Sequence, residues 1–120
     1  MRQIVRGALA LAFLAATWMV AATNESVSAA GGDAEKGKPI FQSKCVSCHG
    51  PKGKGDGPIG KALKPPARDF SSAESKKKPP EELQKIIENG VPKTSMMAWK
   101  KQLNEAEIQD VLAYVMTLRN

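Results

Sequence analysis

Histidine and cysteine are nearly absent from this chain of 120 residues, which has one histidine and two cysteines. A structural zinc site takes four such ligands, and three are present. One histidine also leaves no spare general base for a Ser-His-Asp triad. Cys45 and Cys48 are close neighbours in sequence, so a disulfide between them would connect no distant segments. The chemistry of the chain therefore depends on the few residues around Cys45.

Long apolar segments are also lacking, apart from one near the N-terminus. Residues 7–22 are almost wholly apolar and follow two arginines, Arg2 and Arg6. This run of sixteen residues is shorter than the ~17–25 that a membrane-spanning helix needs. The order of basic, apolar and small residues predicts a signal peptide and lead-in over residues 1–30, cleaved after residue 22 or near residue 30. Residues 31–120 then form one domain; an uncleaved membrane anchor is the alternative.

Strand-like alternation, internal repeats and heptads are missing after this leader, so we predict an all-α domain. One helix is expected to begin at Asp33, and a second begins at Pro80 and ends at Gly90. A third begins at Asn104, which forms a capping box with Glu107. Its apolar face comprises Ile108, Val111, Leu112, Val115 and Leu118. The predicted irregular segments are the Gly- and Pro-rich residues 50–66, the polar connector 71–80 and the loop 91–103.

The run Cys45-Val46-Ser47-Cys48-His49 has the spacing of c-type haem attachment. Two thiols one helical turn apart can add to the two vinyl groups of a porphyrin, and the imidazole that follows then lies beneath the ring. A thioredoxin-like dithiol is the alternative for this spacing, but it expects a βαβ context. We therefore predict one haem c, covalently attached through Cys45 and Cys48, with His49 as an iron ligand.

The second axial ligand must be another residue type, because no further histidine or cysteine exists. Methionine, lysine and an empty position remain. Met116 lies within the last predicted helix beside core positions, where packing accounts for it. Met96 and Met97 lie in the loop 91–103 and are both candidates. A thioether ligand would raise the reduction potential relative to a second imidazole.

Residues 33–120 resemble the class I cytochrome c family, in its small monohaem bacterial form with His and Met ligands. Gly37 and Phe41 match the first helix of that family. Residues matching the last helix are Leu112, Tyr114 and Val115. Gly55-Asp56-Gly57 followed by Leu63-Lys64-Pro65-Pro66 is similar to the loop of a bacterial subgroup. The resemblance implies a cytochrome c fold of about three to four short helices around one covalent haem, with Gly37 permitting close approach of the terminal helices.

The Met-Pro-Ala-Trp motif of this family corresponds to Met96-Met97-Ala98-Trp99. The resemblance implies that Met96 is the second axial ligand, with Met97, which replaces the proline, as the alternative. It also implies that the carbonyl of Pro65, or of Pro66, accepts the second N–H of the ligating imidazole; the alternative is that both prolines only stiffen the loop. Trp99 would shield the haem or donate its indole N–H to a propionate; ordinary core packing is the alternative.

Acidic residues are outnumbered, since 18 Lys and Arg stand against 12 Asp and Glu, a formal charge of +6. Without Arg2, Arg6 and Glu25 of the leader, 16 basic and 11 acidic residues remain, a charge of +5. This balance favours an acidic partner. The lysines of the two loops expected at the haem edge are Lys52, Lys54, Lys61, Lys64, Lys93, Lys100 and Lys101. Residues 76–78 are all lysine, but aromatic residues are few, so we predict no nucleic-acid binding.

These features predict a single-electron carrier and not an enzyme, because two filled axial positions leave no open site on the iron. We expect a monomer in the periplasm that reacts with redox proteins bearing an acidic docking face. It would meet a membrane only through partners or an uncleaved leader. The alternatives are a five-coordinate haem protein (a peroxidase-like enzyme or a gas sensor) and a fixed haem subunit of a larger oxidoreductase.

Overall fold

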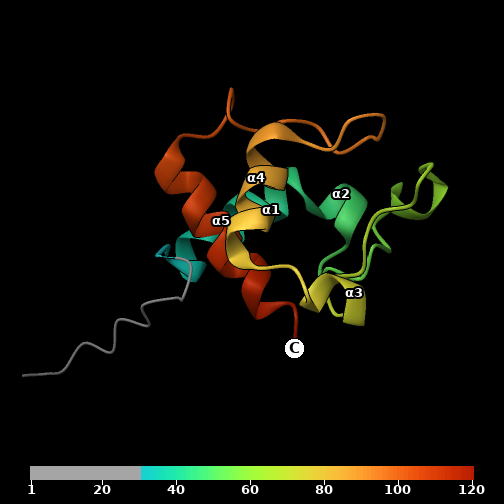
Figure 1. Cartoon of the computed structure of the whole chain (residues 1–120), viewed down its shortest axis with the longest axis horizontal. Coiled ribbons are helices and arrows are strands. Elements are labelled where there is room, and N and C mark those ends of the chain that lie inside the picture. Colours follow the sequence, from blue (N-terminus) through green and yellow to red (C-terminus); the bar gives the residue numbers. More distant parts are fainter. Residues whose placement is uncertain (1–30) are drawn as a thin grey trace, which may run out of the picture.

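The computed structural model describes residues 31–120 and contains only helices and loops over that range. The all-α prediction is therefore confirmed there, while the predicted signal peptide lies outside the described residues. Figure 1 shows the arrangement of the helices, with α1 and α5 adjacent. The elements are α1 (Ala34–Lys44), α2 (Val46–His49), the 3₁₀ helix η1 (Gly60–Ala62), α3 (Ala73–Lys76), α4 (Pro80–Asn89) and α5 (Glu105–Thr117).

Helix α1 begins where the sequence predicts. The carboxylate of Asp33 accepts hydrogen bonds from the backbone N–H of Glu35 at 2.9 Å and of Lys36 at 3.4 Å. These bonds satisfy two of the N–H groups that a helix leaves free at its start. The backbone N–H of Asp33 in turn donates to Oδ1 of Asp110 in α5 at 2.8 Å. The start of α1 is therefore fixed to α5 as well as capped.

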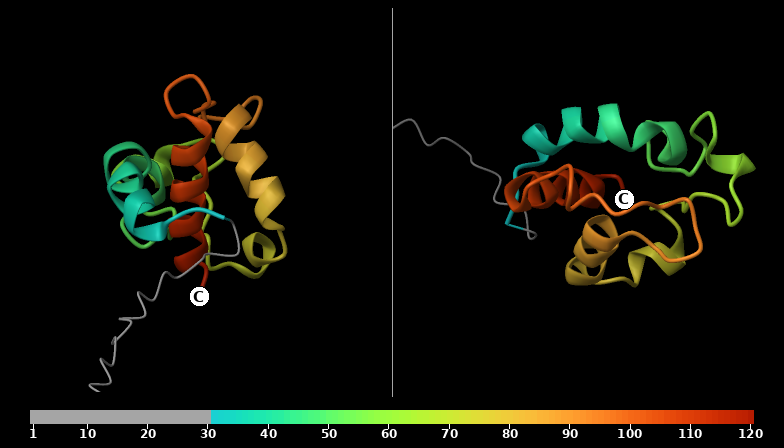
Figure 2. Two further views of the ribbon diagram at one scale, coloured as in Figure 1. Left: turned by 90° about the vertical axis from the view of Figure 1, so that its left-hand side faces the viewer. Right: turned by 90° about the horizontal axis from the view of Figure 1, so that it is seen from above.

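The approach of α1 to α5 depends on Gly37, which is buried. A Cβ atom at this position would lie 1.9 Å from the backbone oxygen of Asp110 and 2.8 Å from the backbone nitrogen of Val111. No residue with a side chain fits at such distances. Figure 2 shows the two helices side by side in its left view. The close crossing expected from the family resemblance is confirmed.

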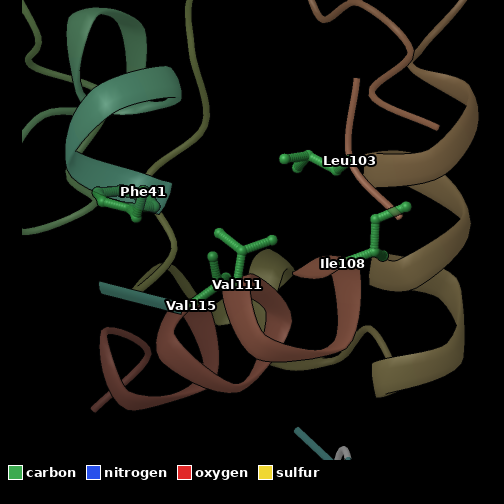
Figure 3. Close-up of a cluster of buried hydrophobic side chains, with 5 residues drawn as sticks. All are labelled: Phe41, Leu103, Ile108, Val111 and Val115. Carbon is green, nitrogen blue, oxygen red and sulfur yellow. The ribbon is translucent and has the colours of Figure 1, made fainter. Parts of the chain in front are cut away.

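Helix α5 supplies most of the core. Its start has the predicted capping box, in which the backbone N–H of Glu107 donates to Asn104 and the Glu107 carboxylate accepts from the backbone N–H of Asn104. The buried cluster drawn in Figure 3 comprises Phe41, Leu103, Ile108, Val111 and Val115. The Phe41 ring also lies 5.3 Å from that of Tyr114, centroid to centroid. The core thus joins α1, α5 and the loop before α5.

Helix α4 begins at Pro80 and is followed by Gly90, as predicted. It packs against α5 on the side away from α1 (Figure 2). Five α-helices are present in residues 31–120 instead of three or four. One is the four-residue α2 of the cysteine motif, and another is α3, within the predicted connector 71–80. Its cap is Ser72, whose Oγ accepts from the backbone N–H of Ser75 at 3.2 Å, and η1 likewise interrupts the loop 50–66.

Candidate functional site

The cysteine motif forms one helical turn, α2, which follows directly after α1. The backbone N–H of Cys45 donates to the carbonyl of Phe41 at 2.9 Å, which closes α1. The carbonyl of Cys45 accepts from the backbone N–H of His49 at 2.9 Å and of Cys48 at 3.3 Å. Both thiols are free. The structure therefore brings the two sulfurs and the imidazole together on a single turn, as the spacing predicts.

These three side chains face a cavity of about 500 Å³, within the range typical of cofactor sites. Its wall is mainly apolar and includes no aspartate or glutamate, but four cationic residues border it: Lys44, Arg68, Lys78 and Arg119. Figure 2, right, shows α1 and α2 along one side of the molecule and α4 with the loop after it along the other. A large apolar group with negative charge at its edge, such as haem, fits this combination of thiols, imidazole, apolar wall and cations.

Burial favours the uncharged forms of Cys45 and His49. Burial, together with the neighbouring Cys48, raises the pKa of the Cys45 thiol to about 11, while Lys44 opposes the shift. Burial also lowers the pKa of His49, which favours the neutral imidazole that can bind a metal. The imidazole stacks on the ring of Phe70, with 4.7 Å between centroids. Phe70 is a contact that the sequence analysis did not identify.

The second nitrogen of the imidazole lies against the segment after the two prolines. The backbone of Arg68 partly offsets the lowered pKa of His49, yet Nδ1 is buried and no hydrogen bond of normal geometry reaches it. Pro65 lines the same cavity, three residues earlier in the chain. Arg68 is therefore the backbone group beside the imidazole. The role expected for the Pro65 carbonyl remains a prediction.

The Gly-rich loop packs directly on the backbone of the motif. Backbone N–H groups of Gly55 and Gly57 donate to the carbonyls of His49 at 2.8 Å and Cys48 at 3.2 Å. A Cβ atom at Gly60 would lie 2.0 Å from the carbonyl oxygen of Cys48. These contacts satisfy carbonyl groups that end a short helix. The loop thus holds the motif turn in place, a function that its composition alone did not reveal.

Across the cavity, the loop after α4 presents the two methionines. The backbone N–H of Met96 donates to Oγ1 of Thr94 at 3.1 Å, and its carbonyl accepts from the N–H of Val91 at 3.0 Å. Met96 is mostly buried, whereas Met97 is 50% exposed. Both line the cavity. The predicted candidates are therefore brought to the same cavity as His49, but in different environments.

Trp99 also lines the cavity and packs against the hydrophobic core. Its backbone N–H donates to the carbonyl of Ile87 in α4 at 3.0 Å, and Nζ of Lys44 lies 5.7 Å from the centre of its ring. Trp99 thereby connects the methionine loop to α4 and α1. Its core-packing role is evident, while a contact with haem remains a prediction.

No helix within residues 31–120 has both the length and the apolar character required to cross a membrane. In the same range, no three residues drawn from His, Cys, Asp and Glu are grouped so as to hold a metal ion.

Arg119 also lines the cavity, and the sequence did not indicate this. Nothing in its local sequence pattern distinguishes it from a surface arginine.

Comparison with known proteins agrees with this arrangement. The family model described as "Cytochrome C oxidase, cbb3-type, subunit III" matches residues 32–115. No curated protein matches the chain. A solved structure titled "Kuenenia stuttgartiensis reducing HAO-like protein complex Kustc0457/Kustc0458" is 26% identical, with a TM-score of 0.62, and covers 72% of this chain. This chain spans 42% of that one, so it corresponds to less than half of its length.

A second solved structure, titled "KustC0563 c-type cytochrome", is 30% identical, with a TM-score of 0.54. The match covers 69% of this chain and 93% of that one. The likeness therefore extends over nearly the whole of a small c-type cytochrome, and it confirms the predicted cytochrome c fold and haem c cofactor. The chain belongs to the family of the cbb3-type cytochrome c oxidase subunit III, and it is a small class I-like c-type cytochrome with covalently bound haem c.

Proposed function

We propose that this chain is a single-electron carrier in which one haem c is attached through Cys45 and Cys48, with iron between His49 and Met96. The observation that carries the proposal is that a single cavity is lined by His49 from α2 and by Met96 from the loop after α4. These two elements lie on opposite sides of the molecule (Figure 2, right). A cytochrome c domain transfers electrons, and the bound haem supplies the redox change.

The residues of the chain perform three tasks around that group. The thiols of Cys45 and Cys48 would attach it covalently, and the neutral imidazole of His49 would bind its iron. Apolar residues of α4 and α5 exclude water from the ring, which limits reorganisation during the redox change. A thioether from Met96 would complete the iron ligands and leave no position for a substrate. The chain therefore acts as a carrier and not as an enzyme.

Met96 is preferred over Met97 as the thioether ligand for two reasons. Met96 is more buried than Met97, and both its backbone N–H and its carbonyl are fixed by hydrogen bonds, with Thr94 and Val91 respectively. Met97 is more exposed, at 50%, and no hydrogen bond among the described residues holds its backbone in the same way. A ligand held in advance loses less entropy when it binds iron.

The red-region charge-transfer band of the ferric protein, which arises from sulfur–iron ligation, tests the proposal. We expect the band in wild type and in Met97→Ala, and its loss in Met96→Ala. The Met97 variant is the matched control, since it removes the adjacent thioether from the same loop. Loss in Met97→Ala alone would move the ligand to Met97. Absence of the band from wild-type holoprotein would contradict thioether ligation and favour the five-coordinate haem protein.

The proposed setting is the periplasm, to which the leader of residues 1–30 would direct a monomeric chain. Its partners would be redox proteins with acidic docking faces, attracted by the lysines of the loops 50–66 and 91–103, which are exposed in the structure. Membrane contact would occur only through those partners or an uncleaved leader. Fractionation of cells that express the full chain, followed by sedimentation analysis of the haem protein, tests location and mass.

A second candidate function is that of a fixed haem subunit in a larger oxidoreductase. The family description names a subunit, and one similar structure is a protein complex. Recovery of the haem protein alone from the periplasmic fraction supports the free carrier. Consistent recovery in a stoichiometric membrane complex supports the subunit.

A further inference from the structure

Arg119, which follows α5, is a buried charged residue in the wall of the haem cavity. Only 8% of its surface is exposed, and no other charged residue in the described part of the chain is as buried. It borders the cavity at the corner formed by the end of α5 and the segment from α3 to α4. In Figure 1 the chain ends beside α3.

The hydrogen-bond partners of Arg119 are all uncharged. Its Nη2 donates to the carbonyl of Ser75 and, at 3.0 Å, to that of Lys78, and Nη1 donates to Sδ of Met116 at 3.2 Å. A guanidinium has five N–H donors, so two of them, the N–H of Nε and one N–H of Nη1, remain without a partner in residues 31–120. None of the ion pairs in that range includes Arg119.

Of the three other cations in the cavity wall, two form ion pairs, and the third, Lys44, lies over the ring of Trp99 and is less buried than Arg119. Arg68 pairs with Glu74 at 2.9 Å, and Lys78 pairs with Glu82 of α4. Arg119 therefore stands apart as a buried positive charge in a cavity that contains no carboxylate. A buried charge is costly unless an opposite charge lies beside it, so this position favours an anion. The group that fills the cavity has two, since haem carries a pair of propionates.

We propose that Arg119 binds a haem propionate through its free N–H groups and thereby raises the reduction potential. Hydrogen bonds from a charged guanidinium to a carboxylate are about twice as strong as those between neutral groups. The ferric haem has one more positive charge than the ferrous form, so an ionised propionate favours the ferric state. A guanidinium beside the propionate offsets that effect and favours reduction. The inference rests on the haem site proposed above and adds a cofactor-binding residue to it.

The test compares Arg119→Gln with Lys77→Gln in the covalent holoprotein. Lys77 is exposed and does not line the cavity, so its variant removes the same charge without touching the site. The potential of Arg119→Gln is expected to shift below wild type and to become pH-dependent in the acid range, because the propionate then protonates more readily. Lys77→Gln should match wild type in both respects. Equal potentials in all three proteins would overturn the proposal.

Arg119 also bridges two carbonyl groups, so a purely structural role needs a separate readout. A tether without propionate contact predicts a lower melting temperature for Arg119→Gln with the wild-type potential retained. Arg119→Lys, which keeps the charge, should restore much of the potential. An NMR contact between the Arg119 Nε–H and the propionate methylene protons of ferrous wild type tests the contact without any variant, and its absence contradicts the proposal.

The charge-transfer band separates this inference from the function on which it rests. Failure of thioether ligation removes the band from wild type. Failure of the Arg119 inference leaves the band intact and makes the potential of Arg119→Gln equal to that of the control.

Discussion

Thr94 fixes the loop that carries Met96 by hydrogen bonding in two directions. Its Oγ1 donates to the carbonyl of Val91 at 2.8 Å and accepts from the backbone N–H of Met96 at 3.1 Å. The Val91 N–H in turn donates to the Met96 carbonyl. These hydrogen bonds fix the backbone of Met96 in the cavity wall, so Thr94 is a positioning residue for the proposed thioether ligand.

Replacement of Thr94 by valine keeps the shape of the side chain and removes both hydrogen bonds. Each typically contributes about 0.5–1.5 kcal/mol, so loss of the two bonds should destabilise the Met96-ligated state by about 1–3 kcal/mol relative to a state with the loop detached. The charge-transfer band should then disappear at a lower temperature than in wild type, while Thr94→Ser should restore it.

The control is Thr117→Val, since Oγ1 of Thr117 likewise donates to a carbonyl three residues earlier, that of Tyr114 at 2.6 Å, but in α5. It should leave the thermal loss of the band at the wild-type temperature. An equal effect of both valine variants would show that Thr94 acts through general stability and not through Met96.

At the scale of elements, the crossing of α1 and α5 determines where the cysteine motif begins, because the motif turn follows directly from α1. The crossing needs a residue without a side chain at Gly37, and Gly37 has no left-handed backbone conformation that would require glycine for another reason. The requirement is therefore purely one of space between two backbones.

Gly37→Ala should destabilise the folded protein. The added methyl group collides with the backbone of Asp110, and overpacking of this kind costs up to about 3 kcal/mol. Alanine has a higher helix propensity than glycine, which offsets about 1 kcal/mol of this cost, so the free energy of unfolding should fall by about 2 kcal/mol. Guanidinium unfolding followed by circular dichroism measures it. Lys38→Ala, at an exposed neighbouring position of α1, is the control and should change little.

The elements also show which local predictions succeed. The capping residues Asp33 and Asn104 and the helix-ending Gly90 were correctly predicted, because caps use contacts within a few residues. The turns α3 and η1 were missed, since serine, glycine and proline composition indicates irregular structure. Their stability comes from specific hydrogen bonds, such as that from Ser75 Oγ to the Asp69 carbonyl at 2.7 Å, which composition does not specify.

For the molecule as a whole, the excess of lysine predicts how it reacts with charged redox partners. Reduction of the ferric protein by hexacyanoferrate(II), an anion, should slow as salt is raised from 0.01 M, where the Debye length is about 30 Å, to 1 M, where it is about 3 Å. Reduction by hexaammineruthenium(II), a cation, should accelerate or stay constant. Stopped-flow absorbance of the haem measures both rates, and anion rates that are independent of salt would contradict a basic docking surface.

The sequence by itself determined the cofactor chemistry, because two thiols and an imidazole within one turn are fixed by local spacing. It also determined the helical class and most of the caps. Only the tertiary structure showed that Met96 is more buried than Met97, placed Arg68 beside the imidazole and brought Arg119 from the end of the chain to the wall of the cavity. These features depend on burial and on contacts between distant segments, and no local pattern of residues encodes either.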